Sequence, residues 1–225
     1  MAILVLAPHA DDEVLGMGGS IARLAAAGRR VVVAVLTGHG EGTHPLWPSS
    51  TWDTIRLEAK EAAGILGVTE LHFRELPAAG LDFTPAWQTN QVVADIIQKI
   101  QPVELYVPFA HDLHQDHQII AYAASVATRS YLPLGQQVKR ILAYETLSET
   151  HLASPYMSPA FQPNVFVDVS DYLETKLEAM QAYRSQLQPD PLPRSTAGLS
   201  ALATFRGAHI GVLAAEAFVL IRETI

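Results

Sequence analysis

The sequence contains no cysteine, and basic residues are in the minority among its charged residues. Without cysteine the chain can form neither disulfides nor zinc sites that depend on thiolate ligands. Fifteen Lys and Arg residues stand against twenty-three Asp and Glu residues, which gives a formal net charge of −8. Because a chain with this charge does not attract polyanions, we expect no nucleic-acid partner and no binding to anionic membranes.

Long hydrophobic runs are also absent. The apolar start, MAILVLAPHADDE, is too short for the core of a signal peptide and is followed at once by acidic residues. The run GVLAAEAFVLI near the C-terminus is too short to span a membrane and is interrupted by Glu216. These features predict a soluble, cytoplasmic protein without stable membrane insertion.

Nearly half of the 225 residues are hydrophobic, which is typical of a globular protein with a sizeable core. We find no internal repeat, no low-complexity tract and no linker long enough to separate two domains. The length and composition therefore predict one domain over residues 1–225.

Apolar strand patterns alternate with amphipathic helical patterns along the chain. Strands are predicted at residues 3–7, 31–37, 69–73, 103–109, 138–144 and 164–169. Helices are predicted at residues 17–27, 53–66, 86–100, 118–131 and 171–187. Asp53 is expected to cap the second helix and Gly67 to stop it, and segments 38–50 and 188–196 are expected to be loops. This order predicts an α/β fold of the Rossmann-like type, with a mostly parallel sheet flanked by helices.

Ionisable residues gather directly behind two of the predicted strands. The first cluster follows the strand at 3–7 and consists of His9, Asp11, Asp12 and Glu13. The second cluster follows the strand that ends at Phe109 and consists of His111, Asp112, His114, Asp116 and His117. Because sites in open α/β sheets form beyond the carboxyl ends of the strands, neighbouring loops can bring the two clusters together.

This set of side chains suits a borderline cation such as zinc, which in catalytic sites typically takes three protein ligands and leaves a position for water. His9 and Asp12 lie three residues apart at a turn and can face one point, and a histidine of the second cluster would complete the set. Asp11 cannot easily point the same way as Asp12, so its carboxylate can lie beside the metal, where a general base belongs. For one carboxylate alone, capping of the following helix is the simpler explanation, but the two clusters together favour a metal.

Glycines follow the first cluster at positions 16, 18 and 19. They permit a tight turn and a close backbone approach at the start of a helix, whose N–H groups can bind an anion. Their spacing is not that of a dinucleotide-binding fingerprint, and the sequence has neither a P-loop nor a G-x-S-x-G elbow. The sequence therefore gives no support to a nucleotide-binding protein or to a serine hydrolase.

The predicted loop at 38–50 and the residues after it carry two histidines and two tryptophans. We expect His39 and His44 to be solvated in this loop. Trp47 and Trp52 are expected either to cover a substrate or simply to anchor the loop.

With these residues in view, the chain resembles the PIG-L/LmbE-like family of zinc-dependent N-acetylglucosamine deacetylases. The first signature of that family, close to [AP]-H-[PA]-D-D-E followed by G-G, is matched by residues 8–13 and by Gly18 and Gly19, with Ala10 in place of the usual proline. Its second signature, H-x-D-H, is matched by residues 114–117. Similar segments continue through FVDVSDYLETKLEAMQAYRSQ and RGAHIGVLAAEAF, so that the resemblance covers nearly the whole chain.

The resemblance implies a role for each matched residue. The zinc ligands would be His9, Asp12 and His117, and Fe²⁺ or another divalent ion is an alternative metal at such a site. Asp11 would be the general base for the metal-activated water. His114, as an imidazolium, would stabilise the oxyanion or protonate the leaving amine, and Asp116 would orient His114 and balance its charge.

The resemblance also implies a substrate that contains N-acetylglucosamine, either a small molecule or a glycoconjugate, from which the acetyl group is removed. Arg56 would bind hydroxyl groups of the sugar, and Glu41 is a further candidate for substrate binding. Members of the family often assemble as homo-oligomers, so we expect the same here. Two alternatives stay open at this point: a metal-dependent hydrolase of another amide or ester, and a metal-binding module without turnover.

Overall fold

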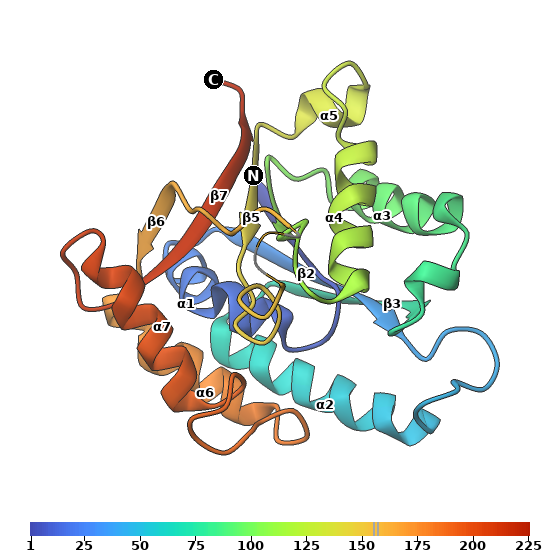
Figure 1. Cartoon of the computed structure of the whole chain (residues 1–225). Coiled ribbons are helices and arrows are strands. Elements are labelled where there is room, and N and C mark those ends of the chain that lie inside the picture. Colours follow the sequence, from blue (N-terminus) through green and yellow to red (C-terminus); the bar gives the residue numbers. More distant parts are fainter. Residues whose placement is uncertain (155, 157) are drawn as a thin grey trace.

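The fold is described by a computed structural model that covers residues 1–154, 156 and 158–225. Its strands are β1 (Ala2–Ala7), β2 (Arg30–Gly38), β3 (Glu70–Pro77), β4 (Glu104–Pro108), β5 (Arg140–Tyr144), β6 (Val165–Asp168) and β7 (Ala215–Glu223). They form a seven-stranded sheet in the order β3-β2-β1-β4-β5-β7-β6 (Figure 1). The first five strands run parallel, and β7 is antiparallel to both β5 and β6. The predicted α/β fold with a mostly parallel sheet is confirmed.

Helices cover both faces of the sheet. Their bounds are α1 (Asp12–Ala26), α2 (Ser49–Leu66), α3 (Ala86–Ile100), α4 (Gln115–Ala127), α5 (Pro133–Gln137), α6 (Leu173–Ala182) and α7 (Thr196–Ala208). Alternate side chains of β1 point to opposite faces, with Ile3 and Val5 packing against α1, α2 and α6, and Leu4 and Leu6 against α3 and α4. Figure 1 shows the two helical layers on either side of the strands. Among the described residues, no helix is both long enough and apolar enough to cross a membrane.

The first helix begins earlier than the sequence predicts, at Asp12 instead of Met17. The backbone leaves helical geometry at Met17, where φ is −152°. Glu216 of β7 stabilises the second half of the helix, because its carboxylate accepts hydrogen bonds from the backbone N–H groups of Gly19 at 3.0 Å and Ser20 at 2.7 Å. The helical amides that could have bound an anionic ligand are therefore occupied by a side chain of the protein itself.

The second helix also begins earlier, at Ser49, directly after Pro48. Asp53 therefore lies exposed inside the helix, and its predicted capping role is wrong. The predicted stop is confirmed, because Gly67 is the C-cap with φ of 73°, a conformation that glycine adopts without strain.

The C-terminal third contains two elements that the sequence did not predict, α7 and β7. The helix predicted at 171–187 is shorter, since a 3₁₀ turn (Ser170–Tyr172) leads into α6, which ends at Ala182. The chain then passes over the carboxyl edge of the sheet before α7 begins. This passage carries Gln186 and Arg194 to the site described next.

Candidate metal centre and active site

Three side chains converge on one point at the carboxyl edge of the sheet. His9 follows β1, Asp12 begins α1, and His117 lies in the first turn of α4. Asp12 Oδ2 lies 3.2 Å from His9 Nδ1 and 3.2 Å from His117 Nε2. The backbone N–H of His9 also donates to this oxygen, at 2.8 Å. The structure therefore brings the three predicted ligands together, in a grouping whose donor atoms could hold a metal ion.

The other nitrogen of each histidine is fixed by a further carboxylate. His9 Nε2 lies 2.9 Å from Asp116 Oδ2, and His117 Nδ1 lies 2.8 Å from Asp112 Oδ2. Asp112 is held in turn by the hydroxyl of Thr150, which donates to its Oδ1 at 2.7 Å. Carboxylates in this position set the orientation and basicity of metal-binding imidazoles. His117 Nε2 is buried and, within the described part of the chain, has no hydrogen-bond partner, so this donor set fits a cation.

The carboxylates also determine the pKa values of the two histidines. Burial alone would lower the pKa of His9, but hydrogen bonds to Asp116 and Asp12 raise it to about 9. Burial would also lower the pKa of His117, yet the charge of Asp12 and the hydrogen bond to Asp112 raise it to about 10. Burial alone would raise the pKa of Asp12, but His117 and His9 hold it well below its usual range. This excess of negative charge is what a divalent cation would balance, replacing the protons on both imidazoles.

Asp11 lies between the ligands His9 and Asp12 in sequence but faces a different direction. Its backbone has φ of 121° and ψ of −25°, a strained conformation for a residue other than glycine. Its carboxylate makes no capping hydrogen bond to α1, which argues against the simple capping explanation. Instead Asp11 Oδ2 lies 3.2 Å from Nε of Arg194. Burial, followed by the charge of Asp12, raises the pKa of Asp11 to about 8, and Arg194 opposes this rise.

The structure changes the roles expected for His114 and Asp116. The Asp116 carboxylate binds His9 and accepts hydrogen bonds from the backbone N–H groups of Ala79 at 2.7 Å and Leu81 at 3.2 Å. It therefore orients His9, and the expectation that this carboxylate orients His114 is wrong. Only the backbone N–H of Asp116 reaches that ring, donating to His114 Nδ1 at 3.1 Å.

The protonation state of His114 also differs from the expectation. Burial, followed by the charge of His9, lowers the pKa of His114 to about 4. This shift favours a neutral ring at pH 7 over the predicted imidazolium. Because Nδ1 accepts a hydrogen bond, the neutral ring carries its proton on Nε2 and can donate it.

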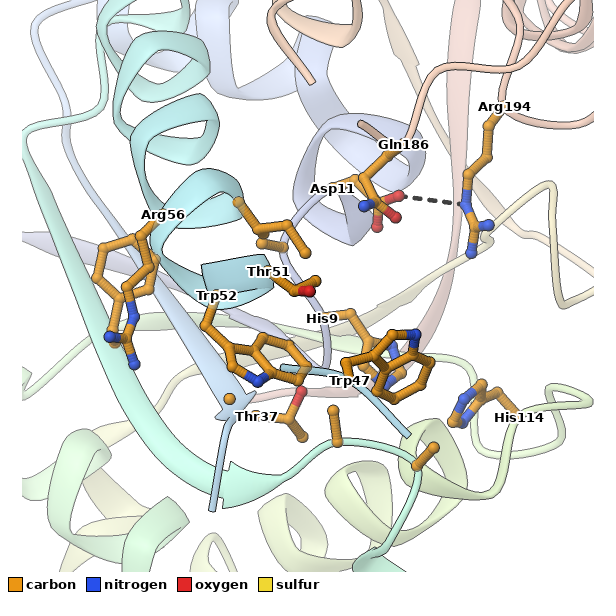
Figure 2. Close-up of a pocket in the computed structure, with 16 residues that line it drawn as sticks. His9, Asp11, Thr37, Trp47, Thr51, Trp52, Arg56, His114, Gln186 and Arg194 are labelled. Atoms are coloured by element: carbon orange, nitrogen blue, oxygen red, sulfur yellow. Dashed lines mark ion pairs between the residues drawn. The ribbon is translucent and has the colours of Figure 1, made fainter. Parts of the chain in front are cut away.

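A cavity of about 260 Å³ adjoins the metal centre (Figure 2). His9, Asp11 and His114 line it together with the aromatic side chains of Trp47, Trp52 and Phe73. Arg56 also lines the cavity, and its guanidinium pairs with Glu75. Glu41 is exposed and is not among the residues that line this cavity, so the structure does not bring it to the site.

The sequence missed two residues of this site. Asp112 was left without a role, although an acidic residue within a histidine cluster is a signal for a hydrogen-bonding partner of a ligand. Arg194 lies in the predicted loop at 188–196, and no local pattern connects it with Asp11. The expectation that His44 is solvated is wrong, because His44 is buried and its Nε2 lies 2.9 Å from the carbonyl oxygen of Ala78.

Known proteins share this architecture. Residues 4–128, more than half of the chain, match the family model described as PIG-L: GlcNAc-PI de-N-acetylase. The chain belongs to the PIG-L family. Both histidine clusters lie inside the matched segment.

Individual relatives of this PIG-L protein are named deacetylases. Diacetylchitobiose deacetylase of Thermococcus kodakarensis is 29% identical over 194 residues, which cover 84% of this chain and 71% of the relative. The uncharacterized deacetylase YaiS of Escherichia coli strain K12 is 30% identical over 195 residues, covering 81% of this chain and 90% of the relative. The solved structure of N,N′-diacetylchitobiose deacetylase from Pyrococcus horikoshii has a TM-score of 0.78 and 26% identity, covering 98% of this chain and 83% of that chain. The predicted membership of a deacetylase enzyme family is confirmed.

Proposed function

We propose that this protein is a metal-dependent deacetylase that removes the acetyl group from an N-acetylglucosamine unit of a small molecule or glycoconjugate. The main support for the proposal is that a possible metal site and a separate carboxylate lie side by side at the carboxyl edge of the sheet. The donor atoms of His9, Asp12 and His117 face one point, and the carboxylate of Asp11 lies beside them at the cavity. The names of the relatives support the choice of an acetylated sugar as substrate.

A divalent cation, with zinc as our choice, would be held by His9, Asp12 and His117 and would acidify water and polarise the acetyl oxygen. Asp11 acts as general base, because its carboxylate lies at the cavity and its Oδ2, although 3.2 Å from Arg194 Nε, accepts no hydrogen bond among the described residues. Its strained backbone keeps this carboxylate turned away from Asp12. A carboxylate whose pKa lies near neutrality can take a proton from the attacking water and return it later in the reaction.

His114 stabilises negative charge as hydrolysis proceeds. Its neutral ring carries a proton on Nε2, and this N–H donates to the acetyl oxygen as the tetrahedral centre forms. A neutral imidazole is a weak acid, so the proton that the departing amine requires comes from Asp11. His114 and Asp11 thus have separate tasks: His114 donates a hydrogen bond and Asp11 transfers the proton.

Acetate release tests this proposal most directly. The wild-type protein and Asp11→Asn are each loaded with zinc, their metal content is measured, and both are incubated with a panel of N-acetylglucosaminides. We expect wild-type turnover and a loss of about 10²–10⁴-fold in kcat for Asp11→Asn at equal metal content. Fully metallated wild-type protein that releases no acetate from any member of the panel would contradict the proposal. Turnover of other amides or esters in its place would favour the alternative hydrolase.

The remaining expectations from the sequence stay predictions. They are the choice of zinc over Fe²⁺, the cytoplasmic location, the homo-oligomeric state, and a single domain over residues 1–225. Metal reconstitution with each ion and light scattering of the purified protein would test the metal and the oligomeric state.

A further inference from the structure

Two tryptophans line the same cavity as His9, Asp11 and His114. Trp47 comes from the connection between β2 and α2, and Trp52 from the first turn of α2. We call this pair the aromatic wall. The ring centroids lie 5.9 Å apart and the ring planes meet at 86°, so the two rings form a corner. Figure 2 shows the two indoles across the middle of the site, with Arg56 on one side and His114 on the other.

The aromatic wall is supported from behind. The His44 ring stacks on Trp47 with a centroid distance of 5.0 Å and an interplanar angle of 27°. His44 is itself fixed, since its Nε2 lies 2.9 Å from the Ala78 carbonyl oxygen and its Nδ1 accepts a hydrogen bond from the N–H of Leu46. Trp47 nevertheless remains 39% exposed, although a large apolar ring gains by burial. A rigid, supported and partly exposed indole at a cavity is well suited to stacking on a ligand.

Trp52 contributes a polar group as well as a ring. Its Nε1 is buried and, among the described residues, has no hydrogen-bond acceptor. A buried N–H without an acceptor is costly, and buried tryptophans normally have a partner. This donor therefore indicates an acceptor supplied by a ligand.

The charges around the cavity restrict the class of ligand further. Two cationic side chains line the cavity, Arg56 and Arg194. Arg56 already pairs with Glu75, and Arg194 lies near the carboxylates of Asp11 and Glu149. Both guanidinium groups already face carboxylates, so their charges are balanced, which favours an uncharged ligand part at the aromatic wall.

We propose that the aromatic wall binds a neutral pyranose ring of the substrate, with an apolar ring face against Trp47 and a hydroxyl oxygen accepting from Trp52 Nε1. A glucopyranose ring fits this description, because its axial C–H bonds form apolar faces and its hydroxyl groups project from the edge. The inference rests on the proposed function and adds a basis for substrate specificity. Acetylated sugars bind at the aromatic wall, whereas the wall does not strengthen the binding of acetamides that lack a ring.

Kinetics on two substrates test this specificity. N,N′-diacetylchitobiose contains pyranose rings, and N-acetylethanolamine is an acetamide without one. For the sugar we expect Trp47→Ala to raise KM about tenfold and Trp52→Phe, which keeps an aromatic ring but removes the N–H, to raise it about three- to tenfold, both with kcat within about twofold. For N-acetylethanolamine neither variant should change kcat/KM. Trp87→Ala is the matched control, since Trp87 lies on α3, is 72% exposed and does not line this cavity.

A binding measurement separates this inference from the proposed function. The chain has three tryptophans, so Trp87→Phe leaves the aromatic wall as the only indole fluorophore. N-acetylglucosamine should change this fluorescence saturably, and Trp47→Ala should weaken the binding about tenfold. Sugar binding that is lost in Trp47→Ala supports the inference even if no acetate is released. Unchanged binding and KM in both wall variants, or equal effects on the two substrates, would overturn the inference while hydrolysis could still stand.

Discussion

The metal centre and the aromatic wall adjoin one cavity but are built in different ways. The metal centre consists of buried, ionisable side chains at the ends of β1 and β4, each held by one or more hydrogen bonds. The aromatic wall consists of two indoles on a connection and the first turn of a helix, held by ring packing. Residues at the ends of strands are held in place by the backbone hydrogen bonds of the sheet. The sequence of a surface connection is less constrained by such bonds and varies more among related proteins.

This difference separates the chemistry from the recognition of the substrate. Changes at the metal centre should alter metal binding or kcat, because they affect groups that act on the reacting atoms. Changes at the aromatic wall should alter KM, because they affect binding that is the same in the ground state and the transition state. Variants of either part can therefore test whether the division holds.

The largest effect is expected for His117→Ala. This change removes one of three ligands and leaves Asp12 and Asp112 buried without their shared partner. We expect no retained zinc after dialysis and acetate release at the background level. Tyr122→Ala, an exposed position on the same helix, should keep full metal content and activity. Stoichiometric metal in His117→Ala would remove His117 from the ligand set.

The next effect in size is expected for His114→Ala, which removes a hydrogen-bond donor but no ligand. We expect kcat to fall about 10²–10³-fold with metal content and KM nearly unchanged. His114→Gln, which retains an N–H donor, should recover part of the loss. A variant that instead loses metal would place His114 among the ligands and not at the oxyanion.

Asp112→Asn should have a smaller effect that appears in metal affinity. The carboxylate of Asp112 faces His117 Nδ1, and an amide would lower the basicity of that imidazole. We expect a loss of about 10–100-fold in zinc affinity, measured by competition with a chelator. Thr150→Val removes only the hydroxyl that supports Asp112 and should cost less. Unchanged affinity in Asp112→Asn would mean that the orientation of His117 does not depend on this charge.

A stability effect is expected for Gly16→Ala, behind the metal centre. A Cβ at position 16 would overlap the buried ring of Tyr144, whose hydroxyl donates to the carbonyl oxygen of Leu6 in β1. We expect a loss of about 1–3 kcal/mol in the free energy of unfolding, measured with denaturant. Gly64→Ala is the control, because a Cβ there meets no atom and should stabilise α2 by up to about 1 kcal/mol. Equal stability of the two variants would show that the packing behind β1 tolerates an added methyl group.

The metal centre and the aromatic wall also differ in how well the sequence predicts them. The ligands His9, Asp12 and His117 could be grouped in advance, because ionisable residues directly after apolar strands must meet at one edge of a parallel sheet. The hydrogen-bond partner of the Asp116 carboxylate could not be predicted in this way. Asp116 is close to His114 in sequence, but its carboxylate reaches His9, a contact that depends on how α4 packs beside β1.

The fold, too, could be predicted only where it follows from local sequence patterns. The parallel strands were predicted from their apolar runs, which reflect burial on both faces. The segment AEAFVLIRE of β7 contains Ala and Glu, which do not favour strands, and it becomes one because it pairs with both β5 and β6. Arg194 reaches Asp11 only because the segment after α6 crosses the sheet edge. Long-range contacts of this kind leave no local pattern in the sequence.

The smallest effect is expected for Arg56→Ala, at a position that also lines the cavity. The resemblance to the family implies that Arg56 binds sugar hydroxyls. Its guanidinium, however, already pairs with Glu75 and lies 5.8 Å from the Phe73 ring centroid, and the side chain is 32% exposed. Exposed ion pairs contribute little free energy, so we expect KM for N,N′-diacetylchitobiose to rise by less than about threefold. Glu75→Gln provides the decisive comparison, because it frees the guanidinium without removing it. A lower KM in Glu75→Gln, abolished in the double variant, would show that Arg56 can bind the sugar and that Glu75 competes for it. A KM that rises more than about tenfold in Arg56→Ala alone would instead extend the binding surface from the aromatic wall to this cation.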